Sequence, residues 1–133
     1  NAGTVNAFGI QGAGIAGSLQ ATWTNATDSY TQSTAQTLTA TRTVTALRNT
    51  AATATTQMDA NHLETFGLLN AATTMWTIDA IDEGRVRQPG TAAANLHVAT
   101  GAGPINITAS ITDNTGGVVP GVTVKAVEVA TGL

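Results

Sequence analysis

The chain has 133 residues, with five Lys and Arg against eight Asp and Glu, and it contains no cysteine. This length fits a single domain with a modest core. We therefore expect one domain over residues 1–133, with 1–24 as a possible extended N-terminal arm. Five scattered basic residues argue against a nucleic-acid footprint. No apolar run approaches the ~20 residues of a transmembrane helix.

Charged residues make up only 10% of the chain, against roughly 25% in an ordinary soluble domain. Leu, Ile, Val and Phe together number 27, so the core of a lone monomer would be thin. Interfaces shared with other copies explain both features, because a residue that faces a neighbour need not be charged. The alternative is a threonine-rich surface solvated by its hydroxyl groups, with or without glycans.

The opening segment carries no charge before Asp28 and is rich in glycine. Such a segment is either a mobile or self-packed tail, or it is held against another surface. We predict strand addition, in which this segment contacts a second copy of the chain, and the tail stays open as an equal alternative. The candidate subunit-interface residues are its apolar side chains, namely Val5, Phe8, Ile10, Ile15, Leu19 and Trp23.

The next elements are predicted from apolar periodicity. Residues 18–25 alternate as in a strand, and a turn follows them. Residues 37–46 place five threonines on one face and apolar or basic residues on the other, which predicts a long strand. Helical spacing also runs through residues 44–58. A helix there, or even from Ser29 onward, therefore remains an open alternative for residues 30–58.

A central amphipathic helix is predicted over residues 61–83. Asn61 can cap it, with Glu64 three residues later as in a capping box. Phe66, Leu69 and Trp76 lie on one helical face and form the expected buried stripe. Gly84 then ends the helix.

From residue 94 the apolar period becomes two. We predict a three-strand antiparallel meander with one apolar face, with a turn at residues 113–117 and a bulge near Lys125. The fold class that follows is α+β, in which threonine-rich strands and a sandwich-like meander accompany the central helix.

The last 25 or so residues resemble the opening hairpin of carboxypeptidase-regulatory-like and related Ig-like β-sandwich modules. The resemblance rests on an Asp-x-x-Gly turn at Asp113, the pair Pro120-Gly121, and the alternation of Val122 and Val124. It implies a β-sandwich and a non-catalytic support or binding role. The later strands of such a module do not follow in this sequence.

No motif assembles into a catalytic or ligand site. Residues 12–17 match the letters GxGxxG, but the flanking βαβ pattern is missing and Asp28 comes too early for its acidic residue. His62 and His97 lack the spacing of a metal pair or an acid–base pair. We therefore predict no catalytic residue, no cofactor and no metal.

Calcium is the one metal alternative. Asp79, Asp82 and Glu83 could gather it with carbonyl oxygens, but no loop of the EF-hand type follows them. No serine lies in a Gly-x-Ser-x-Gly elbow, so nucleophilic catalysis has no support.

These observations predict a non-enzymatic, self-assembling structural subunit of an exported filament, a pilus-like fibre or a virus particle. Its expected partners are other copies of itself, with no nucleic acid, membrane span or small-molecule substrate. The alternative is a monomeric Ig-like adhesion or binding module that uses the threonine face. The expected location is extracellular or the virion surface, after removal of a signal or pro-segment before Asn1. Asn25 and Asn106 begin the two glycosylation sequons.

Overall fold

The computed structural model describes residues 19–101, 103–115 and 121–126, the last group by backbone alone. Within these residues there is one short 3-10 helix, η1 (Gln20–Thr22), no α-helix, and a series of short strands that all pair in parallel. The strands are β1 (Ser29–Gln32), β2 (Gln36–Thr37), β3 (Arg42–Asn49), β4 (Thr55–Gln57), β5 (His62–Asn70), β6 (Trp76–Asp79), β7 (Arg85–Arg87), β8 (Asn95–Thr100), β9 (Ile105–Ile107), β10 (Ser110–Ile111) and β11 (Gly121–Ala126).

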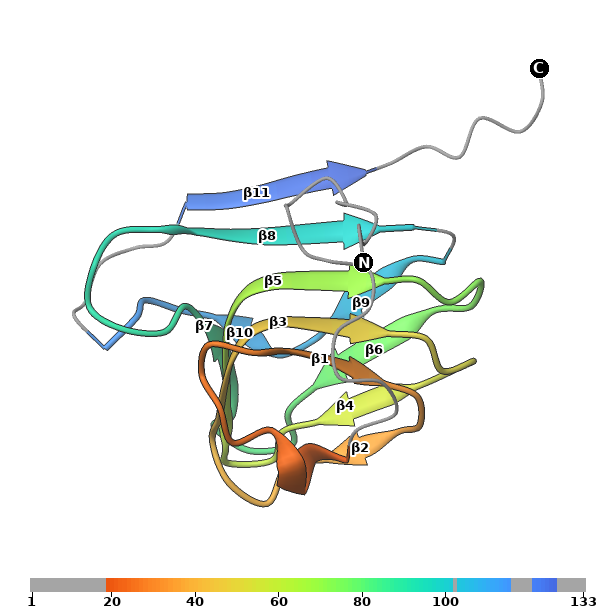
Figure 1. Cartoon of the computed structure of the whole chain (residues 1–133), viewed down its shortest axis with the longest axis horizontal. Helices are drawn as coiled ribbons and strands as arrows, with labels where there is room; N and C mark the ends of the chain where they lie inside the picture. Colours follow the sequence, from red (N-terminus) through yellow and green to blue (C-terminus); the bar gives the residue numbers. More distant parts are fainter. Residues whose placement is uncertain (1–18, 102, 116–120, 127–133) are drawn as a thin grey trace.

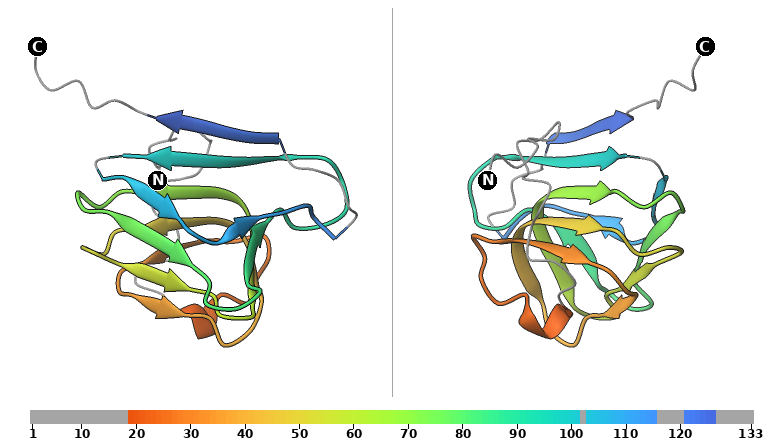
Figure 2. Two further views of the ribbon diagram at one scale, coloured as in Figure 1. Left: turned by 180° about the vertical axis from the view of Figure 1, so that it is seen from behind. Right: turned by 45° about the vertical axis from the view of Figure 1, so that its right-hand side comes forward.

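The chain winds as a parallel β-helix, returning to the same place after each coil. Arg42 pairs with Leu63, and His62 pairs with Arg85. Each coil therefore places its strands directly beside those of the coil before it. One sheet contains β1, β3, β5, β7, β8, β10 and β11, and the other contains β2, β4, β6 and β9. Figures 1 and 2 show the two sheets on opposite sides of the coil.

The larger sheet bends within β5. The first part of this strand, His62 to Glu64, pairs with β7, whereas Gly67 to Asn70 pair with β8. The corner falls at Thr65 and Phe66. In the fourth coil this corner is widened by the loop of residues 88–94 between β7 and β8.

The core lies between the sheets and consists of aligned apolar columns. Tyr30, Leu47, Leu68 and Val98 occupy one register position in four successive coils, and all are buried. The other sheet contributes Trp76 and Ile78, which are both fully buried. Because the same position recurs one coil later, one apolar residue per coil builds a continuous core.

A buried polar column runs beside this core at the end of the larger sheet. Gln32, Asn49 and Asn70 align in successive coils and are fully buried. The Nδ2 of Asn49 donates to the Oδ1 of Asn70 at 3.0 Å. Asn70 in turn donates from Nδ2 to the carbonyl oxygens of Thr74 and Pro104, each at 2.8 Å. These amides satisfy the backbone where the chain turns away from the sheet.

The N-terminal end of the core is closed by η1 and the residue after it. The Nε of Arg42 donates to the Oε1 of Gln20 at 2.9 Å, and the backbone N–H of Gln20 donates to Gln36 Oε1 at 2.8 Å. Trp23 is buried, and its ring lies 6.3 Å from that of Tyr30. Residues 18–25 were predicted as a strand, and that prediction is wrong over Gln20–Thr22.

The predicted helix over residues 61–83 is wrong, because this region forms β5 and β6. Leu63, Leu68, Trp76 and Ile78 point into the core as strand residues, whereas Phe66 is 37% exposed. Asn61 does not cap a helix, since its Nδ2 donates to the Leu38 carbonyl. The turn after Asn70 interrupts any helix. The β-branched residues that follow favour strand.

Gly84 does not end a helix either. A Cβ at this position would lie 2.3 Å from the carbonyl oxygen of Asp59, whose oxygen accepts the Gly84 N–H at 2.8 Å. Glycine is present because two coils approach here too closely for a side chain.

The predicted antiparallel meander is also wrong, and the α+β class with it. The strands β8, β9, β10 and β11 do exist, but each pairs in parallel with a strand of another coil. Alternation of apolar and polar residues indicates a strand, but it does not fix strand direction. The predicted bulge near Lys125 is wrong, because Gly121–Ala126 pair one to one with Asn95–Thr100.

The predicted long threonine strand over residues 37–46 is instead divided between β2 and β3. Thr37 belongs to β2, whereas Thr43 and Thr45 belong to β3. Residues 30–58, for which a helix was the alternative, contain β1 to β4.

Candidate functional site

The charged side chains of the third and fourth coils gather on the outward side of the β5 and β7 pair. Leu63 and Val86 are adjacent in register and fully buried. The residues on either side of them therefore point outward. His62 is level with Arg85, and Glu64 is level with Arg87. We call these four residues the charged face.

Glu64 organises the charged face. Its Oε1 accepts the Nε of Arg87 at 2.8 Å, and the Nη2 of Arg87 lies 2.6 Å from the same oxygen. Its Oε2 accepts the hydroxyl of Thr43 at 2.7 Å. The carboxylate is thus held between the second and fourth coils, so its main role is to orient Arg87.

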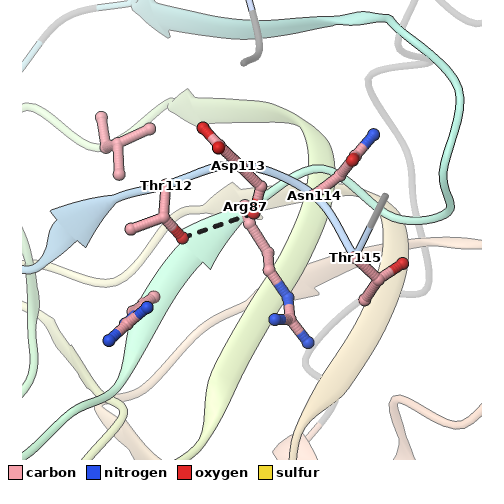
Figure 3. A pocket seen from close by; sticks show the side chains of 7 residues that line it. Arg87, Thr112, Asp113, Asn114 and Thr115 are labelled. Carbon is pink, nitrogen blue, oxygen red and sulfur yellow. Dashed lines mark hydrogen bonds between the residues drawn. The ribbon is translucent and has the colours of Figure 1, made fainter. Parts of the chain in front are cut away.

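An open depression of about 720 Å³ adjoins the charged face (Figure 3). It is lined by Arg85, Arg87 and residues 111–115. The lining loop is fixed, because Asn114 Nδ2 donates to the Ala92 carbonyl and Thr115 Oγ1 to the Gly90 carbonyl, each at 2.8 Å. In Figure 3 the guanidinium of Arg87 and the carboxylate of Asp113 point in opposite directions.

A second, smaller depression of about 280 Å³ lies on the other side of Arg85, among Asp82, Glu83, Thr108 and Ser110. Arg85 lines both depressions and is exposed. An exposed guanidinium beside hydroxyl and amide groups can bind a carboxylate or another polar group. The smaller depression places hydroxyl groups near carboxylates, and Thr108 donates its hydroxyl to the Oδ1 of Asp79.

The two histidines occupy separate positions. His62 is level with Arg85, whereas His97 is level with Gly67 on the other side of the corner. Burial lowers the pKa of His62 below its ordinary value, the charges of Arg87 and Arg85 lower it further, and Glu64 opposes them. Among the described residues, no three His, Asp or Glu side chains form a group that could hold a metal ion.

The lowered pKa of His62 predicts a pH-dependent stability. The unfolded chain takes up a proton at His62 near pH 6.5, about its ordinary pKa, whereas the folded chain does so only at lower pH. The free energy of unfolding should therefore fall as the pH drops from about 8 through 6.5 to below the folded pKa. Urea titrations of the wild type and His62→Gln across this range measure the effect.

The stability difference between these two proteins should change with pH. An Arg85→Ala variant should show a shallower dependence than the wild type, because one repulsive charge is gone. A difference between wild type and His62→Gln that stays constant with pH would contradict this account.

Gln88 follows the charged face and is fully buried. Among the residues that the structure describes, neither its Oε1 nor its Nε2 has a hydrogen-bond partner. A buried polar group without a partner costs about 1–3 kcal/mol. Replacing Gln88 with methionine, which has a similar shape, should therefore raise the free energy of unfolding by about 1 kcal/mol or more, as measured by urea denaturation.

The matched control for Gln88→Met is Gln20→Met. The Gln20 amide donates to Thr39 and accepts from Arg42, so its loss should lower stability. A fall in stability for both variants would mean that Gln88 has a partner, such as an internal water.

The candidate interface residues are placed as follows. Trp23 is buried in the core of its own chain, whereas Leu19 is 59% exposed. Val5, Phe8, Ile10 and Ile15 lie outside the described residues, as do residues 12–17 with the GxGxxG letters. The sequon residues Asn25 and Asn106 are both exposed.

The hydroxyl groups of the threonine face, which was a candidate ligand surface, mainly form hydrogen bonds within the chain. The hydroxyl of Thr39 accepts from Gln20, and that of Thr41 accepts from the His62 N–H. Thr43 donates to Glu64, and Thr45 donates to the Ala26 carbonyl. These hydroxyls fasten neighbouring segments together.

The charged face itself was missed from sequence, because Glu64 was assigned to the start of a helix and its alignment with Arg87 depends on the coil. Glu64 and Arg87 lie 23 positions apart in the sequence, which is one coil. A search for repeats of about that length is the signal that could have found them.

Comparisons with protein-family models, with curated proteins and with solved structures gave no match for this chain. Across the part of the chain that the structure describes, no helix has the length and apolar character to cross a membrane.

Proposed function

We propose that this chain is a non-enzymatic structural subunit that assembles with other copies of itself. The observation that carries this proposal is the edge strand β11. Among the described residues it pairs with β8 and with no other strand. Within the described part of the chain, no strand lies on the other side of its six residues, and such an edge is a ready template for another strand.

The β-helix makes that edge suitable for assembly. All described pairings are parallel, so a strand from a second copy would continue the stacking that already joins the coils. The low charge of the chain supports the same proposal, because few charges would have to be desolvated or would repel one another. We therefore place the subunit in an exported filament, a pilus-like fibre or a virus particle.

A catalytic role has less support. The two histidines lie on different sides of the corner, and the carboxylate of Glu64 is engaged by Arg87 and Thr43. A site for general acid–base or nucleophilic chemistry needs a base within reach of the reacting group. The charged face instead resembles a fixed ion pair with one exposed arginine.

The second candidate function is a monomeric adhesion or binding module. The depression beside Arg85 favours it, because an exposed guanidinium and the polar residues 112–115 could hold an anionic or hydroxylated group. The Ig-like form of this idea is not retained, since the strands pair in parallel. For either function, an extracellular or virion-surface location agrees with the exposed Asn25 and Asn106.

The test measures particle size by sedimentation over micromolar concentrations, in the wild type and in two proline variants of β11. Along a strand, successive backbone N–H groups point to opposite neighbours. Of Thr123→Pro and Val124→Pro, one therefore removes an N–H that faces β8, and the other removes one that faces the free edge.

We expect the wild type to form large assemblies. The proline on the free edge should abolish them while the circular dichroism of the fold is retained. A wild type that stays monomeric would overturn the proposal and favour the binding module. Assembly that survives both prolines would mean that β11 is not the contact.

A further inference from the structure

Arg85 is the exposed cation between the two depressions. It lines both of them and is exposed. In register it lies between His62 of β5 and Ser110 of β10. Among the described residues, the ion pair on this face joins Arg87 to Glu64, and the guanidinium of Arg85 has no hydrogen-bond or ion-pair partner. Its N–H donors are therefore available to a ligand.

The charges around Arg85 limit the kind of ligand that it can hold. Asp113 lines the larger depression, and Asp82 and Glu83 line the smaller one. Within the described part of the chain, none of these carboxylates is at ion-pair distance from Arg85, yet together they make its surroundings negative. A phosphate group carries nearly two negative charges near pH 7 and would be repelled. A single carboxylate gains a short charge-assisted contact with Arg85 and is repelled less.

The lining of the larger depression suits a hydroxylated ring. Figure 3 shows Thr112, Asp113 and Thr115 along a single segment of the chain. Their hydroxyl and carboxylate groups can donate to and accept from the hydroxyl groups of a sugar. Ile111 lines the same depression and is 38% exposed, so it offers an apolar surface to the C–H groups of the ring. The volume of about 720 Å³ is in the range of small-molecule sites.

This lining is already held in place. The backbone N–H of Thr112 donates to the Val86 carbonyl at 3.0 Å, and the hydroxyl of Thr115 donates to the Gly90 carbonyl at 2.8 Å. Arg85 lies in β7, which pairs with a strand on each side. Because the strands and the loop are fixed, a ligand has to order little more than the Arg85 side chain.

We infer that the larger depression binds a hydroxylated ligand with one carboxylate group, of the uronic acid class. The carboxylate accepts from the guanidinium of Arg85, whose paired donors match its geometry. The ring packs on Ile111, and its hydroxyl groups bind to Thr112 and Asp113. This inference deepens the binding role given as the second candidate function and rests on that role. It does not require assembly through β11.

The test is saturation-transfer NMR, which observes the signals of a weakly bound ligand on monomers and on assemblies alike. The probes are sodium glucuronate, glucose and glucose 6-phosphate, compared at millimolar concentration. They differ at one position, which carries a carboxylate, a hydroxyl group or a phosphate. We expect saturation transfer from the protein to the ring protons of glucuronate. The other two probes should bind at least about tenfold more weakly.

Variants of Arg85 test the proposed ion pair. Arg85→Ala should weaken glucuronate binding by about tenfold or more, because a charge-assisted hydrogen bond is lost. Its circular dichroism should match that of the wild type, since Arg85 has no partner within the described residues whose loss would disturb the fold. Arg85→Lys keeps the charge but loses the planar pair of donors, so its affinity should lie between those of the wild type and Arg85→Ala.

Removal of a repelling charge should have the opposite effect. Asp113→Asn should strengthen the binding of glucose 6-phosphate severalfold, because one nearby negative charge is gone. The matched control is Asp28→Asn, which removes the same charge immediately before β1 in the first coil. It should leave the binding of all three probes unchanged.

Several outcomes would overturn the inference. These are the absence of saturation transfer to glucuronate, equal binding of glucuronate and glucose 6-phosphate, and glucuronate binding that Arg85→Ala leaves unchanged. Sedimentation of the same samples reports separately on assembly through β11. A chain that assembles without binding glucuronate would refute the site alone, whereas a monomer that binds glucuronate would refute the assembly alone.

Discussion

Replacing Asn70 with alanine should destabilise this protein by about 4 kcal/mol. The side chain is fully buried and donates to the carbonyl oxygens of Thr74, Gly103 and Pro104. Its Oδ1 accepts from Asn49 and from the Ala72 N–H. Its removal leaves several buried polar groups without partners, each costing about 1–3 kcal/mol. The free energy of unfolding from urea titration measures the loss.

Two variants check the cause of that loss. Asn106→Ala removes an exposed asparagine and should change stability by less than about 0.5 kcal/mol. Asn70→Asp keeps the shape but loses the Nδ2 donors, so it should be no more stable than Asn70→Ala. An Asn70→Ala variant within 1 kcal/mol of the wild type would show that water replaces the amide.

Replacing Trp76 with alanine should cost about 3–5 kcal/mol, as expected for a large aromatic side chain removed from a core. Trp76 is fully buried. Its Nε1 donates to the Thr56 hydroxyl at 2.9 Å, and that hydroxyl donates to the Oε1 of Gln32 at 2.6 Å. The substitution therefore opens a cavity and breaks a chain of hydrogen bonds that connects three coils.

The matched variants separate these two effects. Trp76→Phe keeps most of the apolar volume and loses the indole N–H, so it should cost about 1–2 kcal/mol beyond the change in volume. Phe66→Ala removes an aromatic side chain that is 37% exposed and should cost much less than Trp76→Ala. Equal losses for Phe66→Ala and Trp76→Ala would contradict the assignment of Phe66 to the outer corner.

Strand positions were partly predictable from the sequence. Alternation in residues 94–111 identified strands, and β8, β9 and β10 lie there. Alternation tells which residues share a face, because successive side chains of a strand point to opposite sides. Alternation does not show which strand is the hydrogen-bonded neighbour. Strand direction and coil topology were therefore not predictable from it.

The helix prediction over residues 61–83 failed because a corner interrupts the strand alternation there. Leu63 and Leu68 lie five positions apart, on either side of the corner at Thr65 and Phe66. The corner shifts the strand's alternation by one residue, so the apolar positions on its two sides do not follow a single period of two. Only a partner strand on each side reveals the interruption.

The repeat was the signal that local pattern reading missed. Leu47-Arg48-Asn49 and Leu68-Leu69-Asn70 are 21 residues apart and occupy the same register. Both are followed by an Ala-Ala-Thr run. The repeat indicates a solenoid, in which equivalent residues stack one coil later. It was hard to see because later coils carry loops at the corner, which lengthen the spacing.

The charged face depends on the same hidden period. Nothing near Glu64 in sequence suggests Arg87 as its partner, and the 2.6 Å ion pair exists only because one coil separates them. Candidate interface residues at the start of the chain were chosen for their apolar character. That choice did not distinguish Trp23, which is in the core, from Leu19, which is exposed.

The coil is the unit by which this protein can change in length over evolution, and the corner at Thr65 and Phe66 is the place where loops can enter it. Because each coil contacts only its neighbours, a whole coil of about 21 residues could be duplicated or lost without shifting the register of the others. An insertion or deletion of one residue within a strand would turn core residues outward. The loop of residues 88–94 shows the permitted exception, since it enters at the corner and leaves β7 and β8 paired with β5. Related chains should therefore differ in length by complete coils or by loops at this corner.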